Sequence, residues 1–218
     1  MQYRPSPADS PFIFSEVSVF QTYLELGFRH IISWRATDHL TFLLALCAPY
    51  ALADWRRVLA LVTSFTVGHS LTLALATLGL VTFPTTIIED LIPITIMLAA
   101  LFNLVRAGQP PRARTTVLAK SAPDTAPYLL AAAFGLIHGL GFSNYLRALL
   151  GVQSRPLQEL LAFNVGVEIG QMLVVGVIAG VALLLVRGLG VARRDWILTS
   201  SGAALGVALL LLLQLLTA

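Results

Sequence analysis

The sequence predicts an all-α membrane protein: a polytopic transmembrane bundle of about six helices, preceded by an amphipathic helix at the membrane interface. The chain has 218 residues, of which 57% are hydrophobic and only 11% are charged, and its mean hydropathy is +0.82. A soluble domain carries roughly 25% charged residues. Several apolar runs of about 20 residues are each long enough to cross the ~30 Å hydrocarbon layer of a bilayer. Most of the surface is therefore expected to face lipid.

The N-terminal part is predicted to lie outside the bilayer core. Residues 1–11 contain Pro5, Pro7 and Pro11 and are expected to form a flexible tail. In residues 12–34, apolar side chains recur with a helical period and polar residues lie between them. This pattern is typical of an amphipathic helix at the interface rather than of a span.

The rest of the chain, residues 35–218, is expected to be one transmembrane domain. Proline, glycine and charged turns divide it into spans at about 36–53, 58–81, 86–105, 128–150, 157–186 and 196–216. Pairs of glycines four residues apart let helix backbones approach closely. Such pairs are Gly135/Gly139, Gly166/Gly170 and Gly176/Gly180, and they predict that the fourth and fifth spans are central elements.

The distribution of basic residues predicts the orientation. Nine of the 14 Lys and Arg residues fall on one side of this topology and five on the other. Basic residues concentrate on the cytoplasmic side of membrane proteins, so both termini are expected in the periplasm. Topology also accounts for the net charge of +3. We therefore expect the lipid bilayer, and not nucleic acid, as the partner of this surface.

Three titratable residues lie near the middle of predicted spans. They are His69, His138 and Glu168, on the second, fourth and fifth spans. A charged group at that depth costs roughly 2.5–3.5 kcal/mol, and a buried carboxylate needs a cation or a proton. A lone buried histidine is usually an ordinary core residue, but this combination at one depth predicts a shared site. Imidazole and carboxylate donors without a thiolate cluster suit nickel, cobalt or zinc rather than copper(I).

Two further groups of polar residues allow two interpretations each. Asn164 and Gln171 share a helix face with Glu168; they either bond neighbouring helices together or support the ligands from behind. Asp38 and His39 open the first span. They are either metal-site residues, as two ligands or as a ligand with its orienting carboxylate, or part of a helix start with Thr37 or Asp38 as N-cap.

Four ordered segments carry a family resemblance. They are Gly27-Phe-Arg-His30 with Asp38-His-Leu-Thr-Phe-Leu-Leu-Ala-Leu46, Phe65-Thr-Val-Gly-His-Ser-Leu-Thr-Leu73, Phe134-Gly-Leu-Ile-His-Gly-Leu-Gly-Phe142 and Phe163-Asn-Val-Gly-Val-Glu-Ile-Gly-Gln171. Over about residues 24–175 the chain resembles the HupE/UreJ family of hydrogenase and urease accessory membrane proteins. The resemblance implies a multi-pass protein of the bacterial inner (plasma) membrane, a role as nickel or cobalt permease, and metalloenzyme maturation proteins as partners.

The resemblance also implies a set of metal-carrying residues. By their motif positions they are His30, Asp38, His39, His69, His138 and Glu168. His30 is the outlying member, because the segment between His30 and Asp38 is two residues longer than in the family's motif and lacks its glycine.

Three functions remain open from the sequence. The favoured hypothesis is a divalent-metal permease whose Glu168 exchanges a proton for the metal ion. The second is an intramembrane zinc-dependent hydrolase, in which the ion is bound rather than carried and Glu168 is the general base. The third is a non-catalytic membrane subunit of a larger complex. The small size of the chain leads us to expect a homo-oligomer.

Overall fold

The structure, a computed structural model, describes residues 11–34, 36–108, 125–149 and 156–217. Within these ranges it contains helices and no strand, as the composition predicted. The helices are α1 (Pro11–Ile32), α2 (Thr37–Cys47), α3 (Trp55–Thr77), α4 (Thr85–Gly108), α5 (Ala126–Leu149), α6 (Pro156–Leu183) and α7 (Arg193–Thr217), with a 3-10 turn, η2 (Leu52–Asp54), before α3 and a π-helical turn, η3 (Leu184–Gly188), after α6. The expected flexible tail lies outside the described residues, apart from Pro11.

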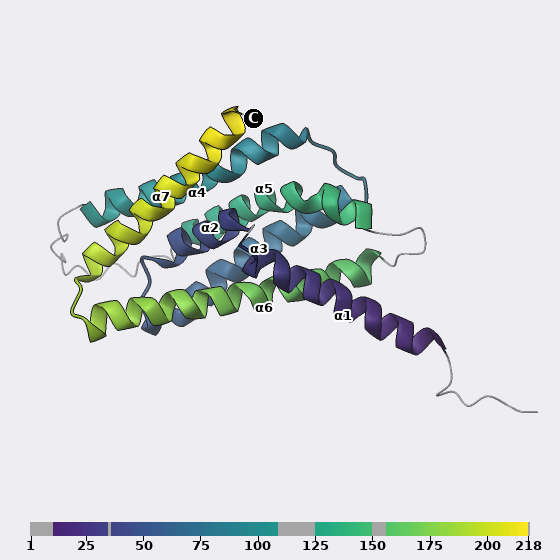
Figure 1. The fold of residues 1–218 in the computed structure, drawn as a ribbon, viewed down its shortest axis with the longest axis horizontal. Helices are drawn as coiled ribbons and strands as arrows, with labels where there is room; N and C mark the ends of the chain where they lie inside the picture. Colours follow the sequence, from purple (N-terminus) through teal and green to yellow (C-terminus); the bar gives the residue numbers. More distant parts are fainter. Residues whose placement is uncertain (1–10, 35, 109–124, 150–155, 218) are drawn as a thin grey trace, which may run out of the picture.

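Five helices, α3 to α7, are long and apolar enough to cross a membrane. They run alternately up and down the bundle (Figure 1) and lie close to the five later spans that the sequence predicted. Described arginines gather where α3 and α7 begin and α4 and α6 end: Arg56, Arg57, Arg106, Arg187, Arg193 and Arg194. We call this the basic end of the bundle and the other the opposite end.

The first predicted span, 36–53, differs from the structure. Its helix, α2, has only 11 residues, which is about 16 Å of helix and too short to cross the bilayer. The sequence stays apolar beyond Cys47, and Ala48 keeps helical dihedral angles, but Pro49 cannot donate the next backbone hydrogen bond. The helix therefore ends at Cys47, and the bundle has five full-length spans and one short helix.

The amphipathic helix expected over 12–34 corresponds to α1, which packs along α6 rather than apart from the bundle. In Figure 1, α1 ends near the middle of the bundle, where α2 begins and continues toward the basic end. The two helices thus form one interrupted segment with its break at mid-depth. Interrupted helices at this depth are a recurrent way of building substrate sites in transporters.

Glycines hold the two closest helix pairs together. A methyl group at Gly135 or Gly139 of α5 would collide with backbone atoms of α3, and one at Gly166 of α6 with backbone atoms of α1. These contacts confirm two of the three predicted glycine pairs. The prediction was wrong for Gly176/Gly180, since no atom of the described residues lies within 4 Å of a methyl group built at either position.

Candidate metal site

All four histidines of the chain lie in one cluster where α1, α2, α3 and α5 meet. The ring of His39 is central, with its centroid 4.7 Å from that of His30. The centroids of His69 and His138 lie 6.1 Å and 5.2 Å from that of His39. His69 is 0% exposed and His138 is 1% exposed. The structure therefore brings His30 into the cluster despite its departure from the family's spacing.

Two of these histidines and the neighbouring Asp38 hold donor atoms close to one another. One donor atom each from Asp38, His39 and His138 lies within 4.8 Å of the others. In a tetrahedral site with bonds of 2.0–2.1 Å the donors are about 3.4 Å apart. Side-chain movements of about 1 Å are enough to complete such a site. These residues are the centre of the candidate metal site.

The ring nitrogens of the cluster are buried and largely without hydrogen-bond partners. Among the described residues, none bonds to Nε2 of His30 or His39, to either ring nitrogen of His69, or to Nδ1 of His138. A buried polar atom left unpaired costs about 1–3 kcal/mol. A cation at the centre of the cluster would satisfy these lone pairs together. The residues present therefore fit a metal ion that imidazole and carboxylate bind.

Asp38 lies beside His39 and does not cap α2. The N-cap of α2 is Ala36, and no side-chain bond caps the helix. The Thr37 hydroxyl donates to the carbonyl of Trp34 at 2.9 Å. Asp38 Oδ2 lies 3.1 Å from His39 Nδ1, and His39 Nε2 has no hydrogen-bond partner among the described residues. The N-cap interpretation is therefore wrong for Thr37 and Asp38, and the metal-site role of Asp38 and His39 stays a prediction.

A threonine that the sequence analysis missed fixes the ring of His138. Thr95 Oγ1 of α4 donates to the carbonyl of Ile92 at 2.7 Å and lies 3.0 Å from His138 Nε2. Because the threonine's hydrogen is already used, His138 Nε2 is the donor in this contact. The lone pair of His138 is then on Nδ1, the atom without a partner. The only sequence signal for Thr95 is nearby Pro93, which removes a backbone donor inside α4.

Glu168 faces α3 at a different place. Its Oε1 accepts a hydrogen bond from Thr63 at 2.8 Å, and it is not part of the Asp38/His39/His138 group. One turn along α6, Gln171 accepts a bond from Thr66 at 2.7 Å. This bond gives Gln171 the helix-bonding role that was one of its two interpretations. Asn164 Oδ1 is buried without a partner among the described residues.

A cavity connects the histidine cluster to the opposite end of the bundle. It has a volume of about 470 Å³, and its lining runs from exposed Arg29, Glu89 and Tyr145 to buried His39 and His138. We call it the histidine cavity. An ion can therefore reach the donors from one side of the bundle without passing between closely packed helices.

Aromatic rings close the site toward the basic end. The ring of Phe42 lies 5.2 Å from that of His138 and 4.8 Å from that of Phe65. On its other side, 5.9 Å away, is Phe134, which lines a second cavity at the basic end. No residue lines both cavities. The three phenylalanines, here called the aromatic layer, are thus the barrier between them.

Comparisons with known proteins give one match. The family model described as HupE / UreJ protein matches residues 10–215, which include every residue of the histidine cluster. No curated protein and no solved structure matches the chain.

Proposed function

The chain belongs to the HupE / UreJ family, and from that premise we propose that it is a membrane permease for a divalent transition-metal ion such as nickel, cobalt or zinc. The observation that carries the proposal is the histidine cluster. Buried ring nitrogens with no partner converge beside Asp38 at the end of a cavity that opens on one side of the bundle. Such donors favour a borderline divalent ion over calcium or magnesium, which prefer oxygen ligands.

Each residue of the cluster has a separate part in this proposal. His39 Nε2 and His138 Nδ1 are the first nitrogen donors. Asp38 adds negative charge and orients His39 through the 3.1 Å contact. His30 receives the ion from the cavity, and His69, fully buried, is the deepest donor. A divalent ion entering the apolar core thereby exchanges its water for protein ligands one step at a time.

Glu168 is assigned a role beside the metal-binding group rather than within it. Its Oε1 is held by Thr63, while Oε2 is buried without a hydrogen-bond partner among the described residues. We assign it the exchange of a proton for the metal ion, which couples movement of the ion to a proton gradient.

The proposed path of the metal ion runs through the two cavities. The histidine cavity is the entry, and the aromatic layer closes the way to the basic end. Passage requires Phe42, Phe65 and Phe134 to separate. The break between α1 and α2 lies beside His30 and Asp38 and is a place where α2 can move without unfolding a continuous helix.

Uptake into proteoliposomes loaded with a metal-sensitive dye tests the proposal. The wild-type chain is expected to admit at least one of Ni²⁺, Co²⁺ and Zn²⁺, and His138→Gln to reduce the rate at least tenfold. Ser200→Ala is the matched control: Ser200 is also buried, but its hydroxyl bonds carbonyls within α7 and it is not among the lining residues of either cavity. Equal uptake by wild type and His138→Gln, or no uptake above empty vesicles for all three ions, would overturn the proposal.

The same donors also suit the second hypothesis, a resident zinc ion that activates water, since a catalytic zinc site has three protein ligands and one open position. The two functions differ in how long the ion stays. A permease releases its ion on dialysis, whereas a hydrolase retains about one per chain. Metal analysis of the purified protein before and after dialysis against a chelator separates them.

A further inference from the structure

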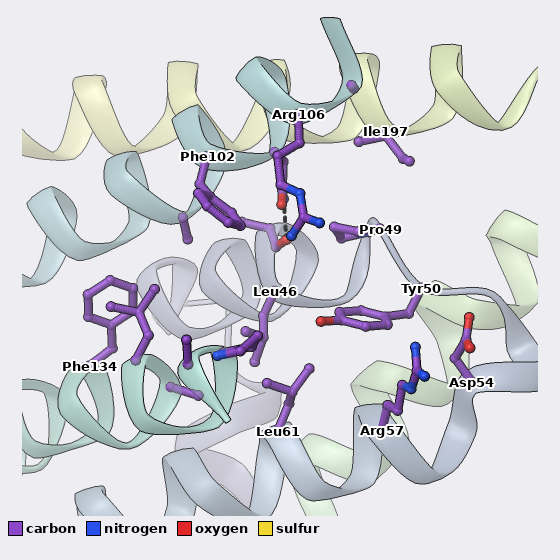
Figure 2. A pocket seen from close by; sticks show the side chains of 18 of the residues that line it. Leu46, Pro49, Tyr50, Asp54, Arg57, Leu61, Phe102, Arg106, Phe134 and Ile197 are labelled. Atoms are coloured by element: carbon purple, nitrogen blue, oxygen red, sulfur yellow. Dashed lines mark hydrogen bonds between the residues drawn. The ribbon is translucent and has the colours of Figure 1, made fainter. Parts of the chain in front are cut away.

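The cavity at the basic end has a different chemistry from the histidine cavity. Its volume is about 620 Å³, and its walls come from the ends of α2, α3, α4, α5 and α7 that meet there (Figure 2). Arg57, Arg106 and Arg193 line it, with Asp54 as the one acidic residue among the lining residues. We call it the arginine cavity. Its charge is unsuited to binding a bare metal cation.

Asp54 and Arg193 are already engaged with each other and with the backbone. Asp54 Oδ2 accepts a bond from the amide of Ala51 at 3.0 Å and lies 3.9 Å from Arg193 Nη2. Arg193 also donates to the carbonyl of Pro49 at 2.6 Å. Neither Arg57 nor Arg106 has an ion-pair partner among the described residues. Within the part of the chain that the structure describes, these two positive charges in the cavity therefore have no acidic partner.

The guanidinium groups of Arg57 and Arg106 both line the arginine cavity. In Figure 2, Arg57 points up into the cavity from α3 and Arg106 points down into it from α4, with the ring of Tyr50 between them and its hydroxyl directed into the cavity. Burial raises the pKa of Tyr50 above its ordinary value, so this hydroxyl stays protonated at neutral pH. Arg106 stacks on Phe102, 5.2 Å from the ring centroid, which restrains its position. Two guanidinium groups and a hydroxyl thus present hydrogen-bond donors to one space.

We propose that the arginine cavity binds a phosphate group, supplied by the headgroup of an anionic phospholipid or by free inorganic phosphate. Guanidinium groups bind phosphate oxygens through paired, charge-assisted hydrogen bonds. Basic pockets between transmembrane helices at the cytoplasmic face are typical headgroup sites. The apolar part of the lining, which includes Leu46, Leu61 and Phe134, suits the glycerol and upper acyl carbons of a lipid. The proposal stands apart from metal transport, because none of these residues belongs to the histidine cluster.

Thermal unfolding of the full chain in detergent tests the site. The additions are phosphatidylglycerol, phosphatidylcholine as the zwitterionic control, and inorganic phosphate against chloride at equal ionic strength. At about ten times its Kd, the bound species is expected to raise the unfolding midpoint by roughly 3–6 °C. A rise with phosphatidylglycerol but not phosphatidylcholine assigns the phosphate to lipid, and a rise with inorganic phosphate alone assigns it to a soluble source.

A pair of neighbouring arginines provides the matched control. Arg57→Gln is expected to lose most of the rise, and Arg56→Gln to keep it, because Arg56 lies over the ring of Trp55 and does not line the cavity. Arg106→Gln, on another helix, is expected to behave as Arg57→Gln does, which guards against a folding defect in one variant. The proposal is overturned if no addition raises the midpoint of the wild-type chain, or if the Arg56 and Arg57 variants respond alike.

Discussion

The hydroxyl of Thr95 on α4 accepts a hydrogen bond from His138 Nε2 on α5 across 3.0 Å, and so decides which nitrogen of His138 carries the lone pair. Helix α4 contributes no histidine, and this contact connects it to the histidine cluster. Through this contact, α4, which contains Pro93, restrains the orientation of the His138 ring on α5. In the proposed metal site, Thr95 would therefore orient a ligand without contacting the ion itself.

Thr95→Val is expected to weaken metal binding by about 10–100-fold, the usual effect of removing a partner that orients a metal-binding histidine. Valine keeps the shape of the side chain but cannot accept the bond, so His138 is free to rotate or to change tautomer. Thr95→Ser restores the acceptor and should restore most of the affinity. Isothermal titration of the purified variants with Ni²⁺ or Zn²⁺ measures this. Equal affinities for the valine and serine variants would show that Thr95 has no orienting role.

Glu168→Gln is expected to separate metal binding from coupling. Glutamine preserves the hydrogen bond from Thr63 but cannot exchange a proton, and Glu168 lies outside the Asp38/His39/His138 group. Metal affinity should therefore change by less than about threefold, whereas uptake should lose its dependence on an imposed pH gradient. Titration and proteoliposome uptake at two pH gradients are the measurements. A large loss of affinity would instead make Glu168 a ligand.

Gly139→Ala is expected to destabilise the bundle by about 1–3 kcal/mol, the usual cost of overfilling a close-packed contact. Its methyl group would collide with the backbone carbonyl of His69. Gly180→Ala is the control, because an added methyl group there meets no described atom within 4 Å, and the higher helix propensity of alanine should leave stability unchanged or raise it by up to about 1 kcal/mol. Thermal unfolding of both variants in the same detergent decides the matter. Similar midpoints for the two variants would contradict the α3–α5 packing described above.

Single cysteines are expected to react from opposite sides of the membrane if the two cavities are separate. The only native cysteine, Cys47, is buried and is first replaced by serine. Ser33→Cys then places a thiol in the histidine cavity, and Ala99→Cys places one in the arginine cavity. A membrane-impermeant maleimide should label the first only from the periplasmic side and the second only from the cytoplasmic side. Labelling of both from one side would show that the aromatic layer is not a barrier.

Sequence reasoning determined the membrane architecture and the depth of the polar residues. Insertion of a span depends on its length and on the summed transfer free energy of its residues, both of which are local properties. Counting along each span was therefore enough to place His69 and His138 at one depth. It failed for α2, where a proline ended the helix inside an apolar run, and for Gly176/Gly180, whose spacing predicted a neighbour that the described residues do not supply.

Only the tertiary structure decided which of these side chains meet. Periodicity shows which residues share one face of a helix, but packing between helices sets the rotation of that face. The close contacts of Gly135 and Gly139 with α3, and of Gly166 with α1, fix those rotations. They bring the ring centroid of His30 to 4.7 Å from that of His39, and they place the carboxylate of Glu168 beside the hydroxyl of Thr63. Thr95, uncharged and without a distinctive motif, became part of the site only through a contact between residues 43 positions apart in the chain.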